Sequence, residues 1–282
     1  MGDDWLSKLH WAAEFESAQD LAPLIRQATN IDEMDEDRTA LWRAVHASRP
    51  DNVAALLAVG ADPLRPMMYG WSPARLSLAT AYPLPTDEVL TPEELAAVEE
   101  RDRLVAALGG MPEDDGYSLA CVAGVDAESA LRLLEAESVE VSEDELEDWW
   151  EDPFEGDAEG TIGVTTVPGG CVLVQPWGFD ASMPGVLRRL TAGSVGYGMY
   201  ANPKSGNQGS IHRDGDTVEW DLHPGGGVAE EETGEDVLRA HLYLGEAAAF
   251  CCAYAGLRLA DDRAFTSPDL WLRLPEREYW NA

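Results

Sequence analysis

Hydrophobic residues in the first third of the chain recur every three or four positions, as on one face of a helix. Leu21, Leu24 and Ile25 show this spacing. A Pro-rich loop predicted over 82–90 precedes a long helix predicted over 91–108, which opens with the Thr-Pro-Glu-Glu pattern of a capping box. The spacing predicts earlier helices over 20–28, 40–47 and 51–58.

Beyond a polar joint at 112–116, short apolar runs replace the helical spacing. The Pro-Gly-Gly at 168–170 and the Asp-Gly at 214–215 separate such runs and are hairpin signals. Two further helices are predicted over 126–136 and 235–255, and the second has a densely apolar middle. The apolar runs predict strands over 117–122, 161–167, 171–175, 195–201, 210–213 and 217–222.

These patterns predict an α+β protein of two domains. Residues 1–111 are expected to form a stack of α-helices. Residues 112–282 are expected to form an α+β domain with a mainly antiparallel sheet. The chain has 282 residues, of which 45% are hydrophobic, so it is long enough and apolar enough for two cores.

A repeated motif supports the helical stack. The run Ser-Lys-Leu-His-Trp-Ala-Ala at 7–13 is similar to Thr-Pro-Leu-His-x-Ala, which opens an ankyrin repeat. Further matches begin at Thr39 and, 33 residues later, at Ser72, and the ankyrin period is about 33. Trp42 and Arg75 replace the His of the motif in these later matches. The first third therefore resembles an ankyrin-repeat domain of about three repeats.

The resemblance implies that the stack binds another protein. It implies that His10 ties neighbouring turns together by hydrogen bonds, rather than acting as a ligand or catalyst. In ankyrin proteins, residues just before the motif and just after its Ala pair face the partner. The large side chains near residue 70 either meet a partner or pack on the second domain. Carried onto this chain, the partner-facing positions are Glu14, Phe15, Arg38, His46, Met68, Tyr69 and Trp71.

Acidic residues far outnumber basic ones. Asp and Glu total 53 against 19 Lys and Arg, a formal net charge of -34. A chain this acidic repels nucleic acid phosphates and anionic membranes, so neither is an expected partner. The charge suits a basic partner protein, or serves solubility alone.

The charge is densest between residues 135 and 159, where thirteen of twenty-five residues are acidic and none is basic. Trp149 and Trp150 lie in the middle of this segment. One interpretation is a solvated linker whose aromatic residues pack back on the fold. The other is an acidic and aromatic docking segment, in which both tryptophans contact a basic partner.

The sequence shows no convincing catalytic or metal site. None of the five histidines lies in a His-Glu-x-x-His motif, and no nucleophile elbow or phosphate-binding loop is present. His212 lies near Asp214 and Asp216, but the Asp-Gly turn breaks the register that would bring them together. The four cysteines form no Cys-x-x-Cys metal pattern. Cys251 and Cys252 are adjacent in an apolar helical run and are expected to be buried free thiols, which fits a cytoplasmic location. No cofactor or metal is expected.

The second part, over about 117–259, resembles an uncharacterised α+β domain family common in actinobacteria. The residues that carry this likeness are 119–126, 170–178 with the core Val-Leu-Val-Gln-Pro-Trp-Gly, and Leu-Arg-Arg-Leu at 187–190. The resemblance implies a fold but does not indicate an activity.

The leading hypothesis is a non-catalytic adaptor or inhibitor that binds a partner protein through its ankyrin fingers and inner helices. One alternative is a bacterial immunity or antitoxin protein whose acidic surface neutralises a basic toxin or nuclease. Another is an enzyme or small-ligand sensor in the C-terminal domain, which no motif supports.

Overall fold

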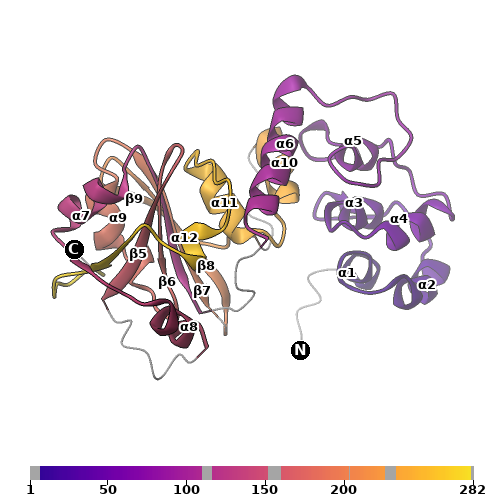
Figure 1. Cartoon of the computed structure of the whole chain (residues 1–282). Helices are drawn as coiled ribbons and strands as arrows, with labels where there is room; N and C mark the ends of the chain where they lie inside the picture. Colours follow the sequence, from indigo (N-terminus) through magenta and orange to yellow (C-terminus); the bar gives the residue numbers. More distant parts are fainter. Residues whose placement is uncertain (1–6, 110–115, 152–159, 203, 226–232, 281–282) are drawn as a thin grey trace. The chain divides into compact units, whose positions relative to one another are not determined.

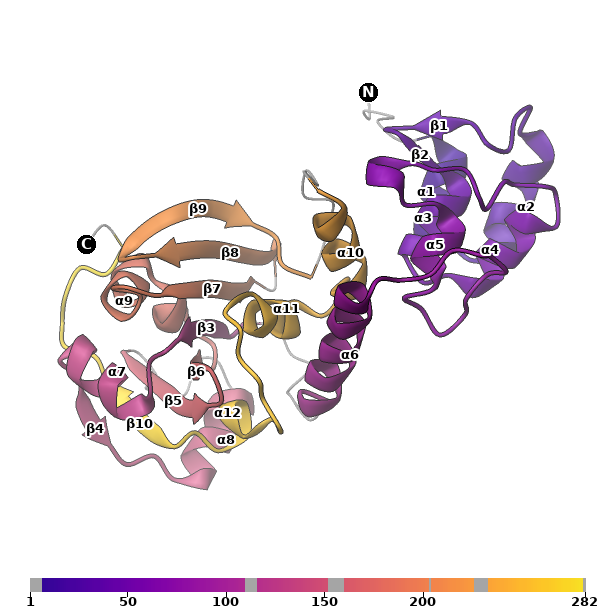
Figure 2. The same ribbon diagram turned by 90° about the horizontal axis from the view of Figure 1, so that it is seen from above.

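The computed structural model describes residues 7–109, 116–151, 160–202, 204–225 and 233–280. The fold is mixed α and β, with one large antiparallel sheet (Figures 1 and 2). Contacts divide the chain into unit 1, Met1–Glu99 with Glu230–Leu244, and unit 2, Glu100–Ala229 with Gly245–Ala282. The sequence predicted one boundary near residue 111. Unit 1 instead ends its first segment at Glu99 and also includes a segment from the second half of the sequence.

Unit 1 is built from short helices, four of which begin at a Ser or Thr whose hydroxyl accepts a backbone N–H three residues further on. A two-stranded hairpin, β1 (Met34–Asp35) with β2 (Arg38–Thr39), separates the first helix pair from the second. The helices are α1 (Lys8–Phe15), α2 (Ala18–Gln27), α3 (Ala40–His46), α4 (Pro50–Leu57), the 3-10 turn η1 (Met68–Gly70) and α5 (Pro73–Ser77).

Polar side chains tie neighbouring helix pairs together. His10 Nε2 donates to the carbonyl of Glu33 over 3.1 Å, which is the structural role expected for this residue. Asn52 Nδ2 donates to the carbonyls of Ala13 and Glu16 over 2.9 Å and 3.0 Å. These bonds satisfy carbonyls at the C-terminal end of α1 that have no partner within the helix.

The third helix pair is irregular. Helix α5 has five residues, and a loop follows it where the sequence predicts a Pro-rich insertion. The hydroxyl of Ser77 accepts from the backbone N–H of Leu84 over 2.8 Å and so holds the loop against α5. The predicted long helix is α6 (Pro92–Ala107), whose first eight residues belong to unit 1 and the remainder to unit 2.

Unit 2 contains an eight-stranded antiparallel sheet in the order β4-β10-β5-β6-β3-β7-β8-β9. The β5 and β6 hairpin and the β8 and β9 hairpin form at the two turn signals of the sequence, which confirms the predicted antiparallel sheet. The strands are β3 (Ser118–Ala123), β4 (Glu137–Val139), β5 (Thr161–Val167), β6 (Gly170–Gln175), β7 (Val195–Asn202), β8 (Gly206–Arg213), β9 (Asp216–Leu222) and β10 (Leu270–Arg273).

Helices cover both faces of this sheet (Figure 1). On one face, α7 (Ala127–Leu134) and α9 (Pro184–Leu190) pack on Val122, Ile162 and Leu173. On the other face lie α11 (Ala247–Tyr254) and α12 (Arg263–Thr266). Alternate residues of the central strands point to opposite faces, so both faces are apolar and the strands are buried.

The prediction of a single helix over 235–255 is wrong. The chain forms α10 (Gly234–Leu242) and α11, separated at Gly245, whose φ of 80° is a left-handed conformation that favours glycine. The N–H of Gly245 donates to the carbonyl of Gly225 over 2.6 Å, which holds the break within unit 2. Helix α10 belongs to unit 1, and α11 belongs to unit 2.

No described helix combines the length and the apolar composition that crossing a membrane requires.

Candidate functional site

The inner side of unit 1 carries a buried row of aromatic and basic side chains. Trp42 on α3 stacks on His46, with ring centres 4.8 Å apart and planes at 16°. The guanidinium carbon of Arg38 lies 5.3 Å from the centre of the Trp42 ring. His241 on α10 approaches from the other end, with ring centres of His46 and His241 5.6 Å apart. We call Arg38, Trp42, His46 and His241 the inner row.

Helix α10 is bonded to this row. His241 Nδ1 donates to the carbonyl oxygen of His46 over 2.9 Å. All four side chains of the inner row are buried. Arg38 and His46, predicted to face a partner, are therefore buried in unit 1. His46 lies next to α10, a helix from the second half of the sequence.

Trp71 has a similar position. It is 1% exposed, and its indole Nε1 donates to the carbonyl of Gly234 at the start of α10 over 2.8 Å. The guanidinium of Arg75 lies 4.2 Å from the ring centre. A side chain at Gly234 would bring its Cβ to 3.3 Å from the Trp71 nitrogen, so glycine permits this close approach. Trp71, another predicted partner residue, contacts the chain's own helix.

Met68 and Tyr69 lie instead at an open cleft of about 460 Å³. Tyr69 is 55% exposed, and Met68 is half-buried. Tyr69, Glu36 and Asp37 all have positive φ, so both loops turn sharply where they meet the cleft. We call this the finger cleft; it is lined by Met34, Glu36, Asp37, Met67, Met68 and Tyr69.

Four lining residues of the finger cleft, Met34, Glu36, Asp37 and Met67, escaped the sequence prediction. A signal for Met34 and Met67 was present, because they are 33 residues apart, the same spacing as Thr39 and Ser72. The two acidic residues lie at the tip of the β1 and β2 hairpin. No local pattern indicates that the tips of these two turns meet in one cleft, since that depends on how the segments of unit 1 pack.

Glu14 and Phe15 lie outside this cleft, near the end of α1. The carboxylate of Glu14 forms an ion pair with Arg43 over 2.9 Å, and Arg43 also pairs with Glu36 over 3.1 Å. Phe15 is exposed and contacts exposed Trp11, with ring centres 4.4 Å apart. Glu14 thus neutralises a buried guanidinium, and Phe15 remains on the surface.

In the acidic segment, Trp149 is buried on α8 (Glu143–Glu151). Its ring meets Trp271 edge to face, with centres 5.4 Å apart, in a small cluster with Leu146. This arrangement agrees with the interpretation in which the aromatic residues pack back on the fold. The side chain of Trp150 lies outside the described residues.

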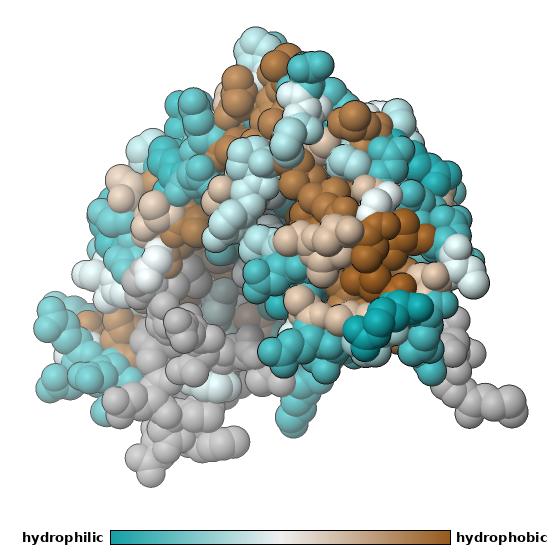
Figure 3. All heavy atoms as spheres, turned by 90° about the vertical axis from the view of Figure 1, so that its right-hand side faces the viewer, coloured by the Kyte–Doolittle hydropathy of each residue, from teal (hydrophilic) through white to brown (hydrophobic). Residues whose placement is uncertain are grey.

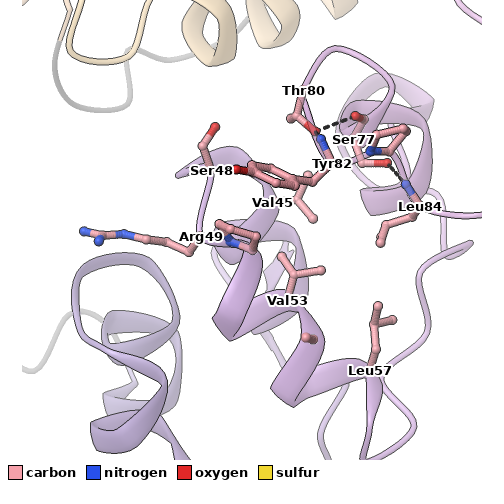
Figure 4. A pocket seen from close by; sticks show the side chains of 12 residues that line it. Val45, Ser48, Arg49, Val53, Leu57, Ser77, Thr80, Tyr82 and Leu84 are labelled. Carbon is pink, nitrogen blue, oxygen red and sulfur yellow. Dashed lines mark hydrogen bonds between the residues drawn. The ribbon is translucent and has the colours of Figure 1, made fainter.

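A second cavity of unit 1, of about 350 Å³, lies between α4 and the loop after α5. Figure 4 shows Val45, Val53, Leu57 and Leu84 around it, while the guanidinium of Arg49 points away. Arg49 Nε donates instead to the carbonyl of Glu14 over 3.0 Å. The residues that line the cavity are mainly apolar, and Arg49 among them is charged. Figure 3 shows hydrophobic residues exposed on the side of unit 1 that lies at the right of Figure 1.

Groups that could catalyse or bind a metal are separated or already bonded. Within the described ranges, no three His, Cys, Asp or Glu residues are grouped for a metal ion. His212 is bonded to the hydroxyls of Ser210 and Thr217, over 3.0 Å and 3.3 Å. All four cysteines are buried free thiols, as predicted for Cys251 and Cys252. Burial raises the pKa of the Cys171 thiol to about 12, so this thiol is protonated at neutral pH.

Burial favours the neutral form of two histidines. Burial, with the nearby charge of Arg188, lowers the pKa of His212 to about 4. Burial lowers the pKa of His46 well below its ordinary value, and His241, Arg38 and Arg43 lower it further. Because the unfolded chain binds protons at pH 6 and these folded sites do not, the folded state loses stability as the pH falls.

We therefore expect the His46→Gln protein to lose less stability than the unaltered protein between pH 6.5 and 5.5. The difference in the slope of the free energy of unfolding against pH should approach about 1.4 kcal/mol per pH unit. Urea denaturation at several pH values measures it. His223→Gln, at an exposed histidine, is the matched control. Equal slopes in all three proteins would contradict the assignment to His46.

No model of a known protein family matches this chain, and no curated protein is significantly similar to it.

Proposed function

We propose that this protein binds another protein at the finger cleft, and that unit 1 is an ankyrin-repeat stack that presents this cleft. The observation that carries the proposal is the composition of the cleft. Three methionines, an exposed tyrosine and two carboxylates line one open depression at the tips of successive turns. Flexible thioethers adapt to different apolar side chains, and tyrosine is frequent among residues that dominate binding energy.

Several features of unit 1 support the ankyrin assignment. Thr39 and Ser72, 33 residues apart, each cap a helix by accepting a backbone N–H, from Trp42 and from Arg75. Each cap follows a tight turn, the hairpin before Thr39 and η1 before Ser72. Helix pairs with a turn at a constant period are the arrangement that this repeat type predicts.

The cleft favours a partner segment that is both apolar and basic. Glu36 shares its carboxylate with Arg43, while Asp37 adds a second negative charge beside the methionines. The formal net charge of -34 would attract such a partner over long distances and raise its association rate. We therefore expect the partner to place an apolar side chain against Met34, Met67 and Met68, next to a Lys or Arg of its own.

The inner row is a weaker candidate for the binding surface. His46 contacts α10, as does Trp71 outside the row, so a partner would have to displace α10 to reach either of them. Arg38 is also buried. The proposal accordingly rests on Met68 and Tyr69, together with the newly found lining residues.

An immunity or antitoxin role is the second candidate. Helix α8 has five exposed acidic residues and no basic residue, which favours a strongly basic partner. The exposed carboxylates are those of Glu143, Asp144, Glu145, Glu147 and Asp148. A toxin gene beside this gene in the native host would favour this role over that of a general adaptor.

The test uses the double variant Met68→Ala, Tyr69→Ala as bait in the native host's lysate, beside the unaltered protein. The captured partner should decrease by about 30-fold or more, which corresponds to roughly 2 kcal/mol at a binding hot spot. Tyr82→Ala is the matched control, because Tyr82 is also an exposed tyrosine of unit 1 but does not line the finger cleft. Equal capture by all three baits would exclude the finger cleft as the binding site.

A further inference from the structure

Strand β9 forms one edge of the eight-stranded sheet of unit 2 (Figure 2). It pairs with β8 on one side, and no described strand pairs with its other side. An edge strand presents a row of backbone N–H and C=O groups that another strand can bind. With seven residues, Asp216–Leu222, β9 is long enough to hold an added strand.

The side chains of β9 leave its apolar surface open. Val218 is 50% exposed and Trp220 is 43% exposed. These two residues are two positions apart, in the part of β9 whose pairing with β8 has register shifts. The ring of Trp220 meets that of exposed Trp280 edge to face, with centres 5.6 Å apart. The edge therefore carries an aromatic and aliphatic surface beside its backbone groups.

Two of the features that normally protect an edge are missing from β9, although its pairing with β8 has register shifts and the strand carries acidic residues. Proteins commonly place Lys or Pro on such a strand, or keep the strand very short. The sequence of β9, Asp-Thr-Val-Glu-Trp-Asp-Leu, contains neither residue. The opposite edge differs, because β4 has three residues and Val139 on it packs against the cluster of Leu146, Trp149 and Trp271.

We propose that the edge of β9 binds an extended segment of another protein as a ninth strand, with apolar and basic residues alternating along that segment. Apolar side chains would lie beside Val218 and Trp220. Basic side chains would lie beside Glu219, which is exposed. Main-chain hydrogen bonds would supply affinity, and this alternation would supply specificity.

The charge argues against a second copy of this chain as the added strand. Self-pairing would bring together two acidic strands from two chains of formal charge -34. Like charges on adjacent strands are destabilising, and the net charges repel at longer range. A basic segment has the opposite charge, so the same edge attracts it.

The test titrates the full chain with a blocked seven-residue peptide of alternating Lys and Val. The variant Val218→Lys, Trp220→Lys should bind this peptide at least tenfold more weakly than the unaltered protein. The matched control is Val59→Lys, Tyr82→Lys, which makes the same change of charge at two exposed apolar residues of unit 1. The control should keep most of its affinity for the peptide, because positive charge added outside β9 is expected to weaken binding only slightly.

Two further measurements identify the binding mode. Bound peptide should slow the hydrogen exchange of β9 amides, and a peptide with Pro at its centre should bind at least tenfold more weakly. Equal weakening in both protein variants, or unchanged exchange at β9, would overturn the proposal. The proposal would also be overturned if the unaltered protein formed a dimer and the Val218→Lys, Trp220→Lys variant were a monomer. The added strand would then come from a second copy of this chain. These outcomes do not depend on the finger cleft, which belongs to unit 1.

Discussion

Replacing Trp71 with alanine is expected to lower the free energy of unfolding of unit 1 by about 3–5 kcal/mol. The indole is 1% exposed, so its removal leaves a large cavity. The substitution also removes the hydrogen bond to the Gly234 carbonyl, which measures 2.8 Å. Because Gly234 begins α10, the loss should be accompanied by release of this helix.

Hydrogen exchange and urea denaturation measure the two effects separately. Amides of α10 should exchange much faster in Trp71→Ala than in the unaltered protein. Trp71→Phe keeps most of the apolar volume and tests the hydrogen bond alone, with an expected loss of about 1–3 kcal/mol. Tyr69→Ala, at an exposed ring two residues away, should change stability by less than about 1 kcal/mol. Unchanged exchange of α10 in Trp71→Ala would show that this residue does not hold the helix.

Gly170→Ala is expected to destabilise unit 2 by about 3 kcal/mol or more. A Cβ at Gly170 would lie 1.9 Å from the carbonyl oxygen of Val122 and 3.0 Å from the Cα of Ala123. Both atoms belong to the backbone of β3, which pairs with β6 in the middle of the sheet. Backbone atoms cannot rotate away as a side chain can, so the two strands must separate to admit the methyl group.

Gly109→Ala is the matched control for this substitution. Its added Cβ would lie 3.6 Å from the nearest heavy atom, the carbonyl oxygen of Ala106, which is ordinary van der Waals contact. We expect its midpoint of unfolding to stay close to that of the unaltered protein. Thermal unfolding followed by circular dichroism compares the two variants. Similar melting temperatures for Gly170→Ala and Gly109→Ala would contradict the predicted contact between β3 and β6.

The two proposed surfaces would recognise similar chemistry on separate units. The finger cleft combines methionines with Glu36 and Asp37, and the edge of β9 combines Val218 and Trp220 with acidic neighbours. Each surface would therefore select apolar side chains next to basic ones. Because the Met68→Ala, Tyr69→Ala and the Val218→Lys, Trp220→Lys variants alter different units, the two contributions to binding can be measured separately.

Local patterns in the sequence determined most of the secondary structure. Strand β5 was predicted with its observed bounds, because its apolar run ends at a turn signal, Pro-Gly-Gly. The helix predicted from residue 126 corresponds to α7, which Asp126 caps: its carboxylate accepts from the N–H of Ser129 over 2.7 Å. The Asp-Gly signal at 214–215 likewise marked the turn between β8 and β9. Such features depend on residues within one turn of each other, so a single sequence is enough to predict them.

Only the tertiary structure decided which side chains are accessible. Arg38, His46 and Trp71 were predicted to face a partner, yet all three are buried. His46 and Trp71 are bonded to α10, a helix that follows them by more than 160 residues. The sequence also predicted α10 and α11 as one helix, because the apolar spacing continues past Gly245. The break depends on a hydrogen bond from Gly245 to Gly225. Periodicity reports which face of an element is apolar, whereas the burial of that face depends on contacts with distant segments, which local spacing does not encode.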